Sequence, residues 1–203
     1  MTFDDLKKYK KAKSIESESL RIRVHRAISW GAAAKKEKSM DSRFIFYWIS
    51  FNALYSNDSE DQPPDKDQRY SFFEKILGFD KNSSLAYAIM GALNSIKILL
   101  ENKFVYSEFW KKYQDAGEPD FELVQERHKK QVYERIISND QVLSALDSVF
   151  SKIYLLRNQI FHGLATYGGK LNREQLTAAA NILEAVVPIM IEIVKNNDNE
   201  DWG

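Results

Sequence analysis

Apolar positions along this chain recur three or four residues apart, and no succession of segments shows the strict alternation of a strand. The eight Gly and four Pro fall mostly between the periodic segments. The pattern predicts helices at about 15–38, 41–55, 69–77, 84–101, 104–114, 120–136, 141–161 and 172–196. We therefore expect an all-α protein.

The segment Phe44–Tyr55 is apolar almost all round, which is typical of a helix in the centre of a bundle. Asp41 is a suitable N-cap for it. The length of 203 residues and a hydrophobic content of 44% indicate one domain over 1–203. Within it we expect a basic arm or short helix at 1–14, an acidic loop at 56–68 and a frayed tail at 197–203.

Composition narrows the classes of function. The chain contains no Cys, which excludes disulfides and thiolate chemistry. Its formal net charge of +0 argues against nonspecific coating of nucleic acid, although residues 1–40 carry eleven Lys/Arg against five Asp/Glu. The N-terminus lacks the apolar core of a signal peptide, and no apolar run looks long enough for a membrane span. We expect a cytoplasmic protein without a membrane partner.

The predicted helix 141–161 carries an apolar stripe interrupted by one charge. Leu146, Val149, Phe150, Ile153 and Ile160 form the stripe. Arg157 lies within it, seven residues after Phe150. A guanidinium on a buried face is costly unless it is paired or faces a polar cleft. Arg157 therefore needs a partner that an exposed arginine does not.

His162 follows Arg157 by five residues, which on an ideal helix places it about 140° away. Asn158 and His162 share a face instead. Arg157 and His162 converge if the helix ends near Gly163 and the chain turns there. They also converge if two chains pair along the apolar stripe and share a cleft, which predicts a homodimer through the 141–162 helix.

Arginine and histidine together suit one kind of chemistry. Arginine offers a permanent planar cation for phosphate, and histidine moves protons near neutral pH. The pair fits attack of a ribose 2′-hydroxyl on the adjacent phosphate. Spacing alone also fits an ordinary helix C-terminus, where cations complement the helix dipole.

The string Arg157-Asn158-x-x-x-His162 resembles the Arg-x4-6-His motif of HEPN domains, whose arginine is often followed by Asn. Its place at the end of a penultimate helix, and the aromatic segment Phe44–Tyr55, also resemble that family. The resemblance implies an up-and-down helical bundle, with additional helices inserted here between the early and late core helices. It also implies a homodimer with facing motifs and metal-independent endoribonuclease activity, often in toxins or phage defence.

By this resemblance Arg157 would bind the scissile phosphate, Asn158 would orient groups and His162 would be the general base or acid. Some HEPN toxins are silenced by nucleotidylation at a Tyr two residues after the His. Leu164 occupies that position here and the nearest Tyr is Tyr167, so that control is in doubt. RNA and a protein antitoxin would be partners. The alternative is a non-catalytic HEPN-like module that binds RNA, a nucleotide or a protein.

Several other residues have two interpretations. Asn52, polar within an apolar helix, either reaches the cleft of His162 or satisfies a buried backbone group. Tyr167 is a candidate for substrate contact. His25 and His128 lie in charged segments and are expected at the surface. With three scattered His and no nucleotide-binding motif, the sequence predicts no metal and no cofactor. The tryptophans expected in the core, rather than as base-stacking platforms, are Trp30, Trp48 and Trp110.

Overall fold

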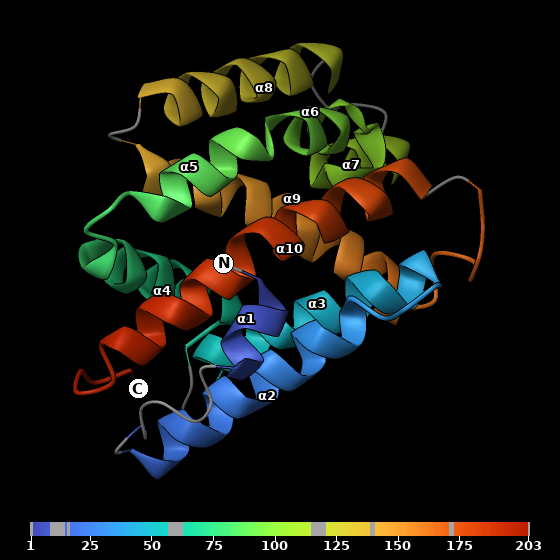
Figure 1. Cartoon of the computed structure of the whole chain (residues 1–203). Helices are drawn as coiled ribbons and strands as arrows, with labels where there is room; N and C mark the ends of the chain where they lie inside the picture. Colours follow the sequence, from blue (N-terminus) through green and yellow to red (C-terminus); the bar gives the residue numbers. More distant parts are fainter. Residues whose placement is uncertain are drawn as a thin grey trace.

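The computed structural model describes residues 2–8, 15, 17–56, 63–114, 121–138, 141–170 and 173–202. In these ranges all regular structure is helical, which confirms the predicted all-α class (Figure 1). The helices are α1 (Phe3–Lys8), α2 (Glu18–Ala34), α3 (Met40–Tyr55), α4 (Asp65–Phe79), α5 (Ser84–Gly91), α6 (Leu93–Glu101), the 3-10 turn η2 (Lys103–Val105), α7 (Ser107–Gln114), α8 (Phe121–Ser138), α9 (Val142–Phe161) and α10 (Arg173–Asn196).

Helix α10 lies at the centre of the bundle and contacts α2 and α3 on one side and α5 and α6 on the other (Figure 1). Most of its residues are buried, including the consecutive run Ala178–Ala180. Small side chains allow neighbouring helices to approach closely on more than one side of it. Pro188 is also buried within α10, where its missing N–H removes one backbone hydrogen bond.

The aromatic helix α3 joins the bundle to α4 and α9. The ring of Phe51 is fully buried and lies 4.6 Å from Phe150 of α9 and 5.9 Å from Phe73 of α4, measured between centroids. Buried aromatic rings contribute large apolar areas, and pairs at these separations add to that burial. The segment Phe44–Tyr55 is therefore part of the core, as predicted, but it is only partly buried on its other side, at Ile45, Phe46 and Ile49, and the central helix is α10.

The structure corrects the prediction that no apolar segment is long enough to span a membrane. Among the described residues, α10 is long and apolar enough, with 67% of its most apolar window buried inside the fold. Helices α5 and α6, which meet at a 59° bend, pass the same test as a pair. Burial of this extent is what the core helix of a bundle shows, and it is weak grounds for a membrane location.

Asp41 does not cap α3. The cap is Ser39, whose side chain accepts a hydrogen bond from the backbone N–H of Ser42. Both Ser and Asp are favourable cap residues, and the chain contains both within three positions. Asp41 instead lies in the first turn, where its carboxylate is buried against Arg173 at the start of α10.

The predicted frayed tail is wrong for the described residues after α10. Trp202 is 8% exposed, its Nε1 donates to the carbonyl of Asn197, and its ring lies 5.6 Å from Phe79. Arg23 of α2 is buried and donates to the Trp202 carbonyl at 3.0 Å. The apolar area of one tryptophan and a buried arginine hold the tail against α2 and α4.

Two predicted segments fall partly outside the described residues. Of the predicted arm 1–14, the part at Phe3–Lys8 forms α1, with Phe3 and Leu6 buried. Of the predicted acidic loop, 57–62 lies outside the described residues. The end of that loop is corrected, because α4 begins at Asp65.

Candidate functional site

Helix α9 ends in a glycine turn at the segment that the sequence singled out. Gly163 adopts a φ of 71°, a left-handed conformation that glycine enters without strain. The N–H of Leu164 donates to the carbonyl of Gln159 at 2.8 Å, and the N–H of Gly163 donates to Ile160 at 3.1 Å. These two bonds form the glycine-terminated C-cap known as the Schellman motif. They fix His162 as the C-cap that follows Phe161, the last helical residue, with the His162 side chain exposed.

Arg157 lies half-buried on α9, between the rings of Tyr154 and Phe161 of the same helix. Its guanidinium carbon is 4.3 Å from the ring centre of Phe161 and 5.9 Å from that of Tyr154. One guanidinium nitrogen donates to Asn158 Oδ1 at 2.8 Å. Within the described residues the buried Nε has no partner, and no carboxylate forms an ion pair with this guanidinium. The positive charge is therefore held by rings and one amide and is not neutralised.

The structure joins Arg157 to Asn158 by a hydrogen bond, and in the described part of the chain no hydrogen bond joins the side chains of Arg157 and His162. The backbone stays helical up to Phe161 and His162 follows directly as the C-cap, so the two residues keep approximately the 140° separation of an ideal helix. The glycine turn comes one residue too late to rotate the imidazole toward the guanidinium. In one chain, the first of the two predicted routes to convergence is not realised.

The second route needs a correction as well. The stripe proposed as the contact between two chains is buried in the protein's own core: Leu146, Val149, Phe150 and Ile153 are each 0% exposed. Fully buried side chains cannot also cover a second copy. The apolar surface left free near the motif lies beyond the stripe, at Phe161, which is 49% exposed.

Two further predicted residues lie near α9 without a contact to the motif. Asn52 is half-buried on α3, one turn beyond Trp48, whose ring lies 6.0 Å from that of Tyr154. Among the described residues no hydrogen bond joins Asn52 to Arg157 or His162. Tyr167 is 74% exposed in the loop that follows α9. Their roles in substrate contact stay predictions.

Sequence reasoning missed how the loop after α9 is fixed. The guanidinium of Arg173 binds both carboxylate oxygens of Asp41, at 2.6 and 2.7 Å, and its Nε donates to the carbonyl of Gly169 at 2.7 Å. Hydrogen bonding to Arg173 lowers the pKa of Asp41 below its usual range. This bidentate ion pair holds the loop against the start of α3. No spacing along the chain reveals a pair 132 residues apart.

A second polar cluster lies between α7, α8 and α9, where the sequence predicted a solvated face. The His128 ring packs edge-on against Tyr106 at 5.5 Å, and Lys152 Nζ lies 3.9 Å above the same Tyr106 ring. Burial lowers the pKa of His128 to about 4 and also lowers that of Lys152. The surface position predicted for His128 is wrong. Its position seven residues after the buried Phe121 indicates the inner face of α8.

Comparisons with known proteins identified no protein similar to this chain. No family model matches the chain, and neither a curated protein nor a solved structure matches it. Within the described residues, no group of three or more His, Asp or Glu side chains is placed to hold a metal ion. The residues of the site themselves indicate its chemistry. An unpaired guanidinium can bind a phosphate oxygen, and the exposed imidazole of His162 can exchange a proton with a bound hydroxyl.

Proposed function

We propose that the end of α9 is the active site of a metal-independent endoribonuclease of HEPN type, which cleaves RNA by attack of a ribose 2′-hydroxyl on the adjacent phosphate. The observation that carries the proposal is Arg157: a half-buried guanidinium without a carboxylate partner among the described residues. Such a charge is partly open to solvent and is not neutralised by the protein itself, so a phosphate from outside can bind it.

The roles follow from position. Arg157 binds the scissile phosphate and stabilises the charge that develops on it. Asn158 holds the guanidinium at 2.8 Å and so fixes its orientation. His162, exposed at the helix end, takes the proton of the 2′-hydroxyl or gives one to the leaving oxygen. The reaction leaves a 2′,3′-cyclic phosphate and a 5′-hydroxyl.

The proposal includes a homodimer, because one chain separates Arg157 and His162 by about 140° around the helix. Two copies that meet at the ends of their α9 helices would place the guanidinium of one beside the imidazole of the other. Phe161 and Leu164, 49% and 76% exposed, supply apolar surface at this end. The corresponding bundle would use α2, α3, α9 and α10 as its core, with α4 to α8 inserted.

The biological setting proposed from the resemblance is a cytoplasmic toxin or a phage-defence nuclease, with a protein antitoxin as partner. A second function is favoured by the separation of Arg157 from His162 within one chain. In that case the protein is a HEPN-like module that binds RNA or a nucleotide without cleaving it.

The reaction is tested by incubating purified protein with single-stranded RNA in EDTA and analysing the product ends. Wild type is expected to leave 2′,3′-cyclic phosphates, and His162→Ala is expected to lose about 100-fold or more of the rate. His25→Ala is the matched control, since His25 is an exposed histidine on α2. Cleavage that persists unchanged in His162→Ala, or product ends with a 3′-hydroxyl, would contradict the proposal.

The dimer has a separate test. His162→Ala and Arg157→Ala are each inactive alone, but a mixture of the two variants regains cleavage if each site takes one residue from each chain. With random pairing, half of the dimers are mixed, and each has one intact site. The mixture should then recover about a quarter of the wild-type activity. No recovery, with subunit exchange confirmed, would place both residues of a site in one chain.

A further inference from the structure

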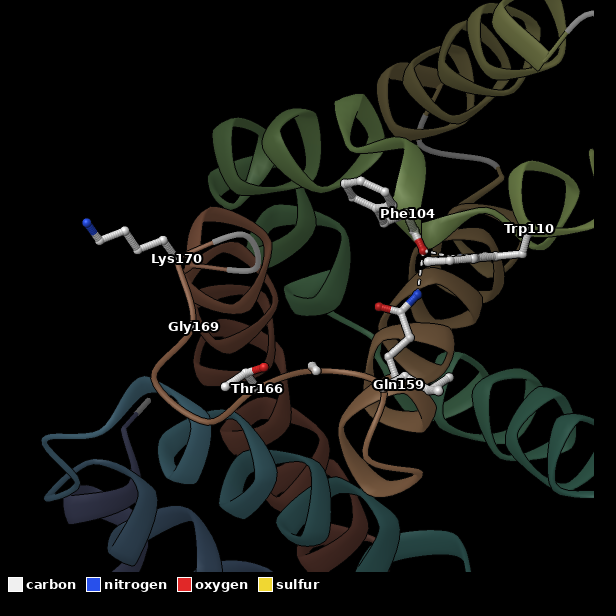
Figure 2. A pocket seen from close by; sticks show the side chains of 8 residues that line it. Phe104, Trp110, Gln159, Thr166, Gly169 and Lys170 are labelled. Atoms are coloured by element: carbon white, nitrogen blue, oxygen red, sulfur yellow. Dashed lines mark hydrogen bonds between the residues drawn. The ribbon is translucent and has the colours of Figure 1, made fainter. Parts of the chain in front are cut away.

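A pocket of about 210 Å³ lies beside the motif, between the η2–α7 corner and the loop that follows α9 (Figure 2). One wall consists of the aromatic rings of Phe104 and Trp110, and Gln159 lies between that wall and the loop. Thr166 and Lys170 belong to the loop side. The volume is below the range of about 300–1,000 Å³ typical for drug-sized ligands, so it suits one planar ring system.

The aromatic wall is fixed before any ligand arrives. The backbone carbonyl of Phe104 accepts two hydrogen bonds, one from Trp110 Nε1 at 2.9 Å and one from Gln159 Nε2 at 2.5 Å (Figure 2). The Phe104 and Trp110 rings lie 5.8 Å apart at 37°. Trp110 nevertheless remains 41% exposed, so the core position expected for it is wrong. An exposed aromatic side chain held by its own N–H is a ready stacking surface.

The hydrogen bond from Gln159 to Phe104 decides which atom of the Gln159 amide can bind a ligand. Because Gln159 uses its amide nitrogen on the Phe104 carbonyl, the oxygen Oε1 is left as an acceptor. In Figure 2 this oxygen points away from Phe104, toward the side of the loop. Gln159 is only 5% exposed, so its orientation is held by packing. A ligand that donates from a ring-bound amino group matches this acceptor.

The loop side adds a cation. Lys170 is exposed and, within the described part of the chain, forms no ion pair. The loop beneath it is turned by a hydrogen bond from the Gly169 N–H to the Thr166 carbonyl at 2.9 Å, and a Cβ at Gly169 would lie 2.9 Å from that carbonyl oxygen. The loop therefore places Lys170 on a defined turn across the pocket from Trp110, and in Figure 2 its ammonium extends outward from the pocket, where the phosphate of a ligand would lie.

We propose that this pocket binds the base of a nucleotide, stacked on Trp110, with its exocyclic amino group on Gln159 Oε1 and its phosphate near Lys170. Adenine and cytosine carry such an amino group, whereas uracil does not. The sugar and phosphate remain outside the pocket, which has room for the ring system alone.

The proposal deepens the proposed function and rests on it only for the source of the nucleotide. Gln159 is two residues from Arg157, so the pocket and the guanidinium lie about 160° apart around α9. The helix is about 10–12 Å across, and an RNA strand that crosses its end from Arg157 to the pocket passes His162. The bound base would then belong to a nucleotide near the scissile phosphate.

The test is calorimetric titration of AMP, CMP and UMP into the intact protein. AMP and CMP are expected to bind more tightly than UMP. Trp110→Ala should weaken AMP binding about tenfold, which is the loss of one stacked base, and Trp110→Phe should restore part of it. Trp30→Ala is the matched control, because Trp30 is 37% exposed and packs on Phe46, away from the pocket. Unchanged thermal unfolding of Trp110→Ala checks its fold.

A short adenylate oligonucleotide, titrated into the His162→Ala variant, separates the two sources. Tighter binding than AMP assigns the pocket to RNA, and equal binding assigns it to a free nucleotide. Equal affinity of wild type and Trp110→Ala for AMP, or no saturable binding of any of these probes, overturns the pocket. That result leaves cleavage by Arg157 and His162 untouched. Conversely, loss of binding in Trp110→Ala with no RNA cleavage by wild type overturns only the nuclease.

Discussion

Two arginines lie against the same tyrosine and differ in what else surrounds them. The guanidinium carbons of Arg69 and Arg157 are 5.6 and 5.9 Å from the ring centre of Tyr154. Arg69, on α4, is 2% exposed and lies 3.5 Å from a carboxylate oxygen of both Asp65 and Asp147. Arg157, on α9, is half-buried, and its one hydrogen bond within the described residues goes to the amide oxygen of its neighbour Asn158.

The difference separates a structural arginine from a functional one. A buried guanidinium must be matched by negative charge, and Arg69 has two carboxylates, one of which also accepts a hydrogen bond from Tyr55 at 2.9 Å. Arg157 is close enough to solvent to persist without such a match. The same ring therefore marks one site where the charge is already neutralised and one where an anion from outside can neutralise it.

The largest change in stability is expected at Arg69. Arg69→Met leaves Asp65 and Asp147 without their buried cation and should lower the free energy of unfolding by about 3–5 kcal/mol. Urea unfolding followed by circular dichroism measures it. Arg43→Met is the control, since Arg43 pairs with Glu184 in a partly exposed ion pair and should cost about 1 kcal/mol. Equal losses in the two variants would contradict the structural role of Arg69.

A smaller loss of stability is expected when Arg69 keeps its charge but loses one of its two carboxylate partners. Asp147→Asn keeps the shape of the side chain but removes one of the two carboxylates. Because Asp147 is 25% exposed and Asp65 remains, we expect a loss of about 1–2 kcal/mol in the same urea measurement. A loss as large as that of Arg69→Met would mean that Asp147 alone carries the pairing.

His128 is also largely covered by the protein, but unlike an arginine it can lose its proton. Burial, with Lys152 adding repulsion, lowers the pKa of His128 from 6.5 to about 4 in the folded protein. The unfolded chain therefore binds more protons between pH 4 and 6.5, and the free energy of unfolding should rise with pH across that window.

The full shift of the pKa would correspond to about 3.4 kcal/mol. Because His128 is partly exposed and solvent screens its charge, we expect a rise of about 2 kcal/mol that flattens in His128→Phe. Thermal unfolding at a series of pH values measures it. His25→Phe, at an exposed histidine, should keep the wild-type slope. A slope that survives in His128→Phe would assign the pH dependence to carboxylates such as Glu108.

The smallest change in stability is expected at Arg157 itself. Arg157→Met removes a charge that has no carboxylate partner among the described residues and keeps an apolar side chain beside Phe161. The free energy of unfolding should change by less than about 0.5 kcal/mol. A loss of several kcal/mol would show that Arg157 is structural, as Arg69 is.

Periodicity predicted where most of the helices lie, because apolar side chains three and four residues apart define the buried face of each helix. It did not reveal the break that divides the predicted helix 84–101 into α5 and α6. It also predicted that α9 ends at Gly163, since a glycine after the last periodic residue is a local signal. The caps and ends were less predictable. Ser39 and Asp41 are equivalent as local signals, and only the position of Arg173 explains why Asp41 is buried.

The candidate site was predictable only as a segment. The sequence identified Arg157 as an arginine on an apolar face, and Tyr154 and Phe161 are its neighbours on the same helix. The lack of a carboxylate partner among the described residues depends on how the other helices pack around α9, and no spacing reveals it. The pocket beside it combines η2, α7 and the loop after α9, so no single stretch of sequence contains it. Trp110 was expected in the core because tryptophan usually is buried, and its exposure follows from one hydrogen bond to the Phe104 carbonyl.

The most direct test of the account compares RNA cleavage in EDTA by wild type, Arg157→Met and Arg26→Met, with folding checked by the urea midpoint. Arg26 is an exposed arginine on α2 and serves as the matched control for loss of one positive charge. The account predicts that Arg157→Met keeps its stability and loses about 100-fold or more of the cleavage rate, while Arg26→Met cleaves like wild type. Wild-type cleavage by a folded Arg157→Met would contradict it.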